Sequence, residues 1–385
     1  ESNEIGEIMN FVETTIAQSI DFSKIATQWS RNYYRNIKNN KDFIQNINFD
    51  DNFELLIKSS FDIVSADDQN QIIKHNEQFS KIKDTKLRRN LDKAVLFTLN
   101  KNNNLDIKKY NVIVIMVESL SAKFMGKFGN ADSITPNLDK LADESIFFTN
   151  FYATGTRTVR GLEAFSLSVP PTPGSSIIRR PNNANLFNAS TIFKQAGYEI
   201  SFIFGGYSYF DNLNKFFSSN NYKVIDRSDF SSEEISFSNV WGVADEDLLF
   251  KGLVELDKNY QSGKPFFSLI MTTSNHRPYT FPEGRIDLPS GGGRNAAVKY
   301  TDYAIGRFFE EARKKEWFKD TIFVITADHC AASAGKVNLP VAQYHIPLMI
   351  YNPHILKPKQ VDNLASQIDI IPTILGILNL PHTTK

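Results

Sequence analysis

The chain has 385 residues, enough for one large domain or two to three ordinary ones. Its 43 basic and 43 acidic residues cancel, so the overall charge gives no reason to expect nucleic-acid binding. The single cysteine, Cys330, excludes an intramolecular disulfide, and no run of 18 apolar residues is present that would cross a membrane.

Residues 1–108 are rich in Asn, Lys, Asp and Ile. Segments such as Glu7–Ile20 and Leu87–Leu99 carry apolar residues at helical spacing. We therefore expect a helical N-terminal linker or subdomain over 1–108, followed by a catalytic domain over 109–385.

The pattern changes from Tyr110 onward. Val112–Val117 is a short, continuously apolar run, which is typical of a buried central strand. Comparable runs recur along the rest of the chain at Ile146–Phe151, Ile200–Phe204, Phe266–Thr272, Thr321–Thr326 and Pro347–Tyr351.

Helical patterns alternate with these predicted strands. A helix start is predicted at Thr135-Pro136, a capping residue followed by proline. Longer helical patterns span Asp245–Asp257, Ala297–Lys314 and Ile368–Leu378. The alternation predicts an α/β fold with a mostly parallel central sheet and helices on both faces.

Polar residues follow two of the predicted strands directly. Glu118 comes after Val112–Val117, and a carboxylate there indicates a cap, a salt bridge or a metal ligand. Asp328 and His329 follow Thr321–Thr326 and could offer an oxygen and an imidazole nitrogen to one cation. Functional groups gather at the carboxyl ends of strands in such sheets.

A third candidate lies between Ala153 and Gly161, where a Gly-containing turn leads into a predicted helix at Gly161–Leu167. A helix N-terminus favours a nearby anion, and Arg157 and Arg160 suit phosphate oxygens. The Thr158 hydroxyl is a nucleophile only if a metal or a base lowers its pKa. Taken alone, the segment is better interpreted as a polar turn with a helix cap.

Taken together, these segments resemble the alkaline-phosphatase superfamily. They are most similar to its sulfatase-like phosphoglycerol transferases, the lipoteichoic acid synthases and the glycerophosphotransferases of periplasmic glucans. The resemblance covers about residues 108–380 and lies in Val117-Glu118-Ser119, Gly155–Gly161, Ser274-Asn275-His276, Ala327-Asp328-His329 and Tyr344–Pro347, with Asn150–Pro173 and Ser366–Thr373 in support.

The resemblance implies a set of metal ligands, namely Glu118, Thr158, Asp328 and His329. It also implies that Thr158 is the residue that becomes covalently modified, with Thr156 as the competing candidate.

By the same resemblance, His276 and His345 match positions that contact the phosphate or the leaving and attacking groups. Arg157 or Arg160 would then stabilise charge on the phosphoryl oxygens.

The chain also departs from relatives. Thr158-Val159-Arg160 lacks the Cys/Ser-x-Pro-x-Arg motif of true sulfatases, which argues against sulfate ester hydrolysis. Phosphoethanolamine transferases usually have several disulfides, so one cysteine argues against that branch. Cys330 stands where many relatives have Gly, and we interpret it as a spacer.

The resemblance therefore implies transfer of glycerophosphate from a phosphatidylglycerol-type lipid to a glycan or polyglycerophosphate hydroxyl. One divalent cation is expected, with Mn favoured over Mg or Zn. Alternatives are a phosphodiesterase or phosphatase, a phosphoethanolamine transferase, and a catalytically silent binding module. The first residue is Glu1 rather than Met, so any signal or membrane segment is expected to lie outside this chain. The lipid donor implied by the resemblance leads us to expect membrane helices upstream of Glu1 and an extracytoplasmic location.

Overall fold

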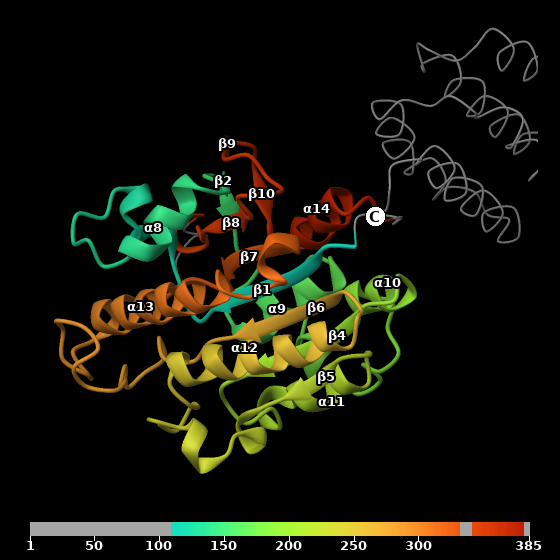
Figure 1. Ribbon diagram of the computed structural model, residues 1–385, viewed down its shortest axis with the longest axis horizontal. Helices are drawn as coiled ribbons and strands as arrows, with labels where there is room; N and C mark the ends of the chain where they lie inside the picture. Colours follow the sequence, from blue (N-terminus) through green and yellow to red (C-terminus); the bar gives the residue numbers. More distant parts are fainter. Residues whose placement is uncertain (1–108, 332–340, 381–385) are drawn as a thin grey trace, which may run out of the picture. The chain divides into compact units, whose positions relative to one another are not determined.

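The computed structural model describes residues 109–331 and 341–380 (Figure 1). The helices predicted at Glu7–Ile20 and Leu87–Leu99, and the whole segment 1–108, lie outside these ranges. Among the described residues, no helix combines the length and apolar character needed to span a bilayer.

The described residues form an eight-stranded sheet in the order β5-β4-β6-β1-β7-β8-β2-β9. Its parallel centre consists of β1 (Asn111–Val117), β4 (Glu199–Phe204), β5 (Lys223–Ile225), β6 (Phe266–Met271) and β7 (Thr321–Ala327).

One edge of the sheet is mixed. There, β8 (Leu348–Tyr351) runs antiparallel to β7 and to β2 (Ile146–Phe148), and β9 (Lys359–Val361) runs parallel to β2. Two shorter strands, β3 (Phe151–Tyr152) and β10 (Ala365–Ser366), pair separately.

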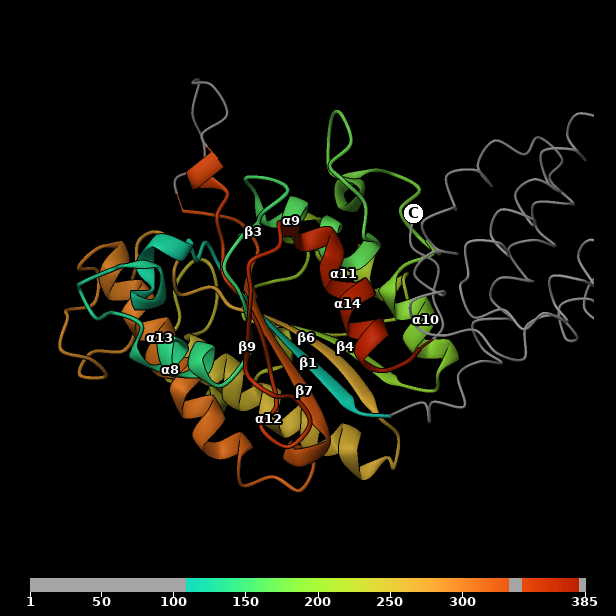
Figure 2. The same ribbon diagram turned by 90° about the horizontal axis from the view of Figure 1, so that it is seen from above.

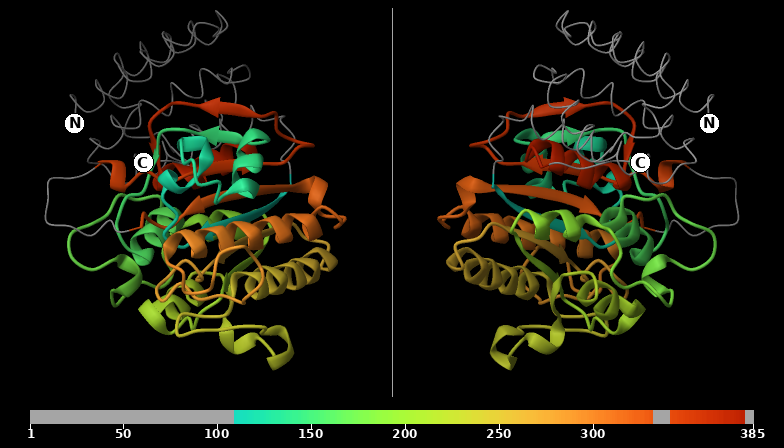
Figure 3. Two further views of the ribbon diagram at one scale, coloured as in Figure 1. Left: turned by 90° about the vertical axis from the view of Figure 1, so that its left-hand side faces the viewer. Right: turned by 90° about the vertical axis from the view of Figure 1, so that its right-hand side faces the viewer.

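Helices cover both faces of the sheet. One layer contains α8 (Pro136–Asp143), α12 (Asp245–Gln261) and α13 (Arg294–Ala312), and the other contains α9 (Thr158–Leu167), α10 (Ala189–Gln195) and α11 (Leu213–Ser218) (Figure 2). Figure 3 shows α12 and α13, in yellow to orange, running along the strands. The predicted α/β class is confirmed.

The remaining elements are short or terminal. The 3-10 helices are η1 (Ala122–Phe124), η2 (Gly126–Phe128), η3 (Ile177–Arg179), η4 (Phe210–Asn212), η5 (Arg227–Asp229), η6 (Ser232–Glu234), η7 (Phe318–Asp320), η8 (Val341–Gln343) and η9 (Gln367–Asp369). Helix α14 (Ile370–Ile377) follows η9.

The centre of the sheet is apolar because helices cover it on both sides. Residues 112–116 of β1 have no exposed surface. Aromatic rings fill one side of it: Phe193 of α10 stacks on Phe267 of β6 at 4.1 Å between ring centroids. On the same side, Phe202 of β4 stacks on Phe217 of α11 at 3.9 Å.

Two predicted elements differ from the structure in ways that affect the site. The run Ile146–Phe151 is not one strand, because it splits into β2 and β3, which pair with different partners. Helix α9 begins at Thr158 rather than at Gly161, so the predicted nucleophile lies in the first helical turn.

Candidate active site

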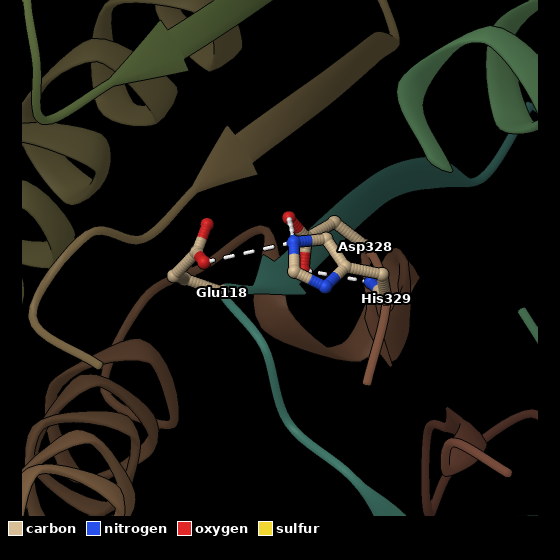
Figure 4. Close-up of side chains that lie close together, drawn as sticks. All are labelled: Glu118, Asp328 and His329. Atoms are coloured by element: carbon tan, nitrogen blue, oxygen red, sulfur yellow. Dashed lines mark hydrogen bonds and ion pairs between the residues drawn. The ribbon is translucent and has the colours of Figure 1, made fainter. Parts of the chain in front are cut away.

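Two neighbouring strands bring the predicted ligands together. β1 and β7 are parallel and in register, with Val117 beside Ala327, so the residues that follow them meet at one edge of the sheet. Ligand atoms of Glu118, Asp328 and His329 all lie within 4.8 Å of one another (Figure 4). No other element is needed to bring these three side chains into contact.

Asp328 is fully buried beside a second carboxylate. Its Oδ1 accepts hydrogen bonds from the backbone N–H groups of Ser119 and His329, each at 2.8 Å. Its Oδ2 is buried without a hydrogen-bonding partner among the described residues. Burial, together with the charge of Glu118, raises the pKa of Asp328. A bound cation would offset the repulsion between the two carboxylates and would give Asp328 Oδ2 a partner.

His329 has its ring oriented by the backbone. Nδ1 lies 2.8 Å from the carbonyl oxygen of Cys330, which can only accept, so Nδ1 donates and Nε2 keeps its lone pair. Nε2 faces Asp328 Oδ2 at 3.3 Å and Glu118 Oε1 at 3.8 Å. Burial alone would lower the pKa of His329, but the two carboxylates raise it. Two oxygens and a nitrogen facing one point form a donor set that fits a divalent cation.

Glu118 is held by the neighbouring strand end. Its backbone N–H donates to Thr272 Oγ1 at 3.0 Å, and its carbonyl accepts from Asn275 Nδ2 at 2.8 Å. Ser119 Oγ donates to Glu118 Oε1 at 2.6 Å. Ser119 itself has φ of 51°, a left-handed conformation that is uncommon for a non-glycine residue.

Thr158 is the threonine that reaches this cluster. Its hydroxyl lies 3.4 Å from Glu118 Oε2, at the N-terminal turn of α9, where unpaired backbone N–H groups favour negative charge. Thr156 lines the same pocket but makes no hydrogen bond to the three side chains within the described residues. The approach depends on Gly161, where an added Cβ would lie 2.1 Å from the carbonyl oxygen of Asp328.

The cluster opens into a pocket of about 480 Å³. Its lining combines polar groups, among them Arg157 and His329, with apolar and aromatic side chains such as Phe210 and Trp241. His276 also lines it, and its ring packs against Trp241 at 3.5 Å between centroids, tilted by 34°. Arg157 is exposed and, among the described residues, has no ion-pair partner. It is therefore free to meet an anion in the pocket.

Two residues predicted to contact substrate, Arg160 and His345, do not line the pocket. The Arg160 guanidinium pairs with the buried Glu163 at 3.3 Å and donates to the carbonyl of Gly174. His345 Nε2 lies 2.7 Å from the carbonyl of Thr149, and its ring packs between Phe128 and Tyr152. The predicted contact of Arg160 and His345 with substrate stays a prediction.

Several pocket residues were not predicted from the sequence. Phe210, Trp241 and Arg294 line the pocket, yet they come from a 3-10 helix, a loop and the start of α13. One signal was available: the aromatic segment that ends in Phe210 follows β4 directly, at the edge where functional groups gather.

Comparison with known proteins identifies the family of this chain. The sequence profile of the sulfatase family matches residues 110–380. The chain belongs to the sulfatase family. The predicted membership of the alkaline-phosphatase superfamily is thereby confirmed.

Curated relatives of the chain are named as lipoteichoic acid synthases and phosphoglycerol transferases. The chain is 26% identical over 298 residues to lipoteichoic acid synthase 2 of Bacillus subtilis, covering 70% of this chain and 45% of that protein. It is 25% identical over 288 residues to phosphoglycerol transferase I of Xanthomonas campestris, covering 70% and 41%. The chain therefore spans less than half the length of these relatives.

Two solved structures resemble the fold of this chain. A protein of the alkaline phosphatase superfamily from Vibrio parahaemolyticus has a TM-score of 0.69 and 39% identity, covering 72% of this chain and 68% of that one. A lipoteichoic acid synthase from Listeria monocytogenes has a TM-score of 0.64 and 23% identity, covering 72% and 75%, which shows the shared fold alone.

Proposed function

We propose that this chain is a divalent-cation-dependent phosphoglycerol transferase that works outside the cytoplasm. Its donor would be a phosphatidylglycerol-type lipid, and its acceptor a hydroxyl of a glycan or a polyglycerophosphate. The observation that carries the proposal is the Thr158 hydroxyl, 3.4 Å from Glu118 in the same buried cluster as Asp328 and His329. The names of its curated relatives add support.

Glu118, Asp328 and His329 would hold the cation, together with the Thr158 oxygen. When bound, the cation supplies positive charge that lowers the pKa of a coordinated hydroxyl and offsets charge on phosphoryl oxygens. Oxygen donors with one imidazole suit Mn, Mg or Zn, and we propose Mn on the strength of the family resemblance.

In the first step, the Thr158 oxygen attacks the phosphorus of the lipid head group. The phosphorus–oxygen bond to diacylglycerol breaks, and the hydroxyl proton of Thr158 passes to the leaving oxygen. We propose that His276, which lines the same pocket, moves that proton. Its Nδ1 can donate to the Arg277 carbonyl at 3.2 Å, which would leave Nε2 as an acceptor. Arg157 would stabilise the charge on the equatorial oxygens.

In the second step, an acceptor hydroxyl attacks the glycerophosphate carried by Thr158. The Thr158–phosphorus bond breaks, and the proton of the acceptor returns to the Thr158 oxygen. The donor is a membrane lipid, so the pocket would work close to a bilayer surface, with the membrane segment in a part of the protein outside this chain.

Intact-protein mass spectrometry after incubation with phosphatidylglycerol and Mn²⁺ tests this proposal. We expect a mass increase of one glycerophosphate, mapped by peptide fragmentation to Thr158. Thr158→Ala should abolish the adduct and lower turnover by at least about a thousandfold.

Thr156→Ala is the matched control, because it removes the neighbouring hydroxyl of the same turn. It should keep the adduct. An adduct on Thr156, or none on either threonine while turnover continues, contradicts the proposed nucleophile. Product formed with water as fast as with glycan or glycerol phosphate acceptors would identify a hydrolase instead.

A further inference from the structure

An exposed group of aromatic side chains lies beside the pocket and has no part in the proposed donor chemistry. Tyr209 is 78% exposed, Phe210 50% and Tyr207 41%, and the nearby Val240 is 84% exposed. Single exposed apolar side chains are common, but a contiguous exposed group of them often marks a site of interaction. We name Tyr207, Tyr209, Phe210 and Trp241 the aromatic rim.

Direct contacts join the rim into one surface. Tyr207 stacks on Tyr209 at 5.7 Å between ring centroids, and Phe210 meets Trp241 edge-on at 5.8 Å. Arg227 connects the two ends, because it lies over the Tyr207 ring at 5.1 Å and donates to the carbonyl of Asn239 at 2.9 Å. The two loops that follow β4 and precede α12 therefore form a single platform.

The rim is continuous with the pocket. Phe210 and Trp241 line the pocket, and the Trp241 ring packs against His276, which we propose to lie next to the reacting phosphorus. A molecule lying on the exposed rings would thus have one end beside Thr158. That is the position an acceptor must take up in the second step.

The charges and rings of the rim together indicate which acceptor chemistry it suits. Asp211 lines the pocket and pairs with Arg179 at 3.4 Å, so its negative charge is offset. Arginines such as Arg157 line the pocket itself, whereas the exposed Tyr207 ring lies against the guanidinium of Arg227. A polyglycerophosphate chain has one negative charge per unit and no ring, so the aromatic faces of the rim offer it no stacking partner.

A sugar ring meets all of these conditions. Its C–H faces are apolar and pack on aromatic rings, whereas its hydroxyls can bond to a carboxylate such as Asp211 and to a guanidinium such as Arg227. A few polar groups among aromatic side chains are the usual composition of a site for such a ligand.

We propose that the aromatic rim is an acceptor subsite that binds the sugar rings of a glycan. This inference rests on the proposed function. A sugar hydroxyl oxygen forms the new bond to phosphorus, the bond from phosphorus to Thr158 breaks, and the hydroxyl proton replaces the phosphoryl group on the Thr158 oxygen. Tyr207 and Tyr209 bind rings further along the glycan.

The test uses Tyr209→Ala and the double variant Tyr207→Ala with Tyr209→Ala. The acceptor probe is a β-linked glucose hexasaccharide, and the donor is phosphatidylglycerol with Mn²⁺. We expect the KM for the hexasaccharide to rise roughly tenfold in the single variant and further in the double variant. The effect should be confined to the acceptor, with the KM for the lipid and the yield of the Thr158 adduct little changed.

Tyr260→Ala is the matched control, since Tyr260 is 40% exposed near the end of α12, far along the chain from the pocket loops. It should leave the KM for both substrates unchanged. An unchanged acceptor KM in the double variant overturns the proposal. So does a raised KM for the lipid alone, which would mean that the rim binds the donor.

A measurement of sugar binding that needs no donor lipid distinguishes an error in the proposed function from an error in the assignment of the rim. Saturation-transfer NMR on the hexasaccharide should show contact of sugar protons with the wild-type protein and a loss of that contact in the double variant. If no Thr158 adduct forms yet the sugar binds in this way, the chemistry is wrong and the subsite stands. If the adduct forms and no sugar contact is seen, the subsite is wrong.

Discussion

Gly161 is the residue that lets the nucleophile approach the carboxylates. It lies on the first turns of α9, three positions after Thr158, and its Cα faces the backbone of Asp328. A Cβ at this position would lie 2.1 Å from the Asp328 carbonyl oxygen and 2.7 Å from its carbonyl carbon. Backbone atoms cannot rotate out of the way as a flexible side chain can. A larger residue at position 161 would therefore push α9 away from the end of β7.

Gly161→Ala is therefore expected to remove activity while damaging the fold far less. A shift of about 1 Å between the nucleophile and its ligands can lower a rate roughly a hundredfold, and overpacking of this kind costs about 1–3 kcal/mol. The rate of adduct formation on Thr158 and the thermal denaturation midpoint, measured on one preparation, check both parts.

Gly376→Ala is the control for the general effect of replacing a helical glycine. A methyl group there meets no described atom within 4 Å, and alanine is the better helix former by about 0.5–1 kcal/mol. This variant should be fully active and slightly more stable. If Gly161→Ala is equally active, the close packing of α9 on the strand end does not position Thr158.

At the scale of elements, α8 takes its N-terminal cap from a different helix. Thr135 precedes the helix and was predicted to cap it, but its side chain makes no capping hydrogen bond. Instead, the buried carboxylate of Asp302 in α13 accepts from the backbone N–H groups of Asn137 at 3.1 Å and Leu138 at 2.8 Å. The cap thus joins two helices of the same layer.

Asp302→Ala should consequently destabilise the protein without altering the pocket. It leaves two N–H groups of a helix N-terminus without an acceptor, which costs about 2 kcal/mol. Denaturant unfolding measures the loss. Glu310→Ala on the exposed side of the same helix removes a surface ion pair at 3.7 Å and should change the free energy of unfolding by less than about 0.5 kcal/mol. Equal losses in the two variants would contradict the capping role.

Much of the sheet could be predicted from the sequence because its central strands are buried on both faces. β1, β4, β6 and β7 are short runs in which most residues are apolar, as expected for strands buried on both faces. β5, β9 and β10 have three residues or fewer, too few to show a period. In the run Ile146–Phe151, the polar pair Thr149-Asn150 stands at the break, and the pairing of β2 and β3 with different strands fixes it.

The cluster of Glu118, Asp328 and His329 could be predicted because parallel strands in register must bring their carboxyl ends together. The predicted contacts of Arg160 and His345 rested on motifs alone. In the structure, Arg160 meets Glu163, a neighbour one helical turn away, and His345 meets rings from distant segments. Loop residues such as Trp241 reach the pocket only through the path of the folded chain, which no local pattern encodes.

At the scale of the whole molecule, the fold brings two buried carboxylates close together at one edge of the central sheet. The central strands of the sheet are apolar and buried, yet two carboxylates and an imidazole meet where β1 and β7 end. Asp328 and Glu118 are both nearly without solvent contact. Like charges in such a place oppose folding unless a cation lies between them. The stability of the entire α/β body should therefore depend on the cation.

Removal of divalent cations with EDTA is expected to lower the thermal denaturation midpoint, and Mn²⁺ is expected to restore it. At a free concentration one hundred times its dissociation constant, a ligand that binds only the folded state contributes about 2.7 kcal/mol. For a domain of this size, that corresponds to a shift of about 5–10 °C.

Asp328→Asn should abolish the Mn²⁺ effect and, without cation, should melt no lower than the wild-type protein, because it removes one of the two opposed charges. Asp287→Asn, a change at an exposed carboxylate paired with Lys299 at 2.7 Å, should keep the full shift. A wild-type midpoint that is the same in EDTA and in Mn²⁺ would mean that the three side chains hold no cation.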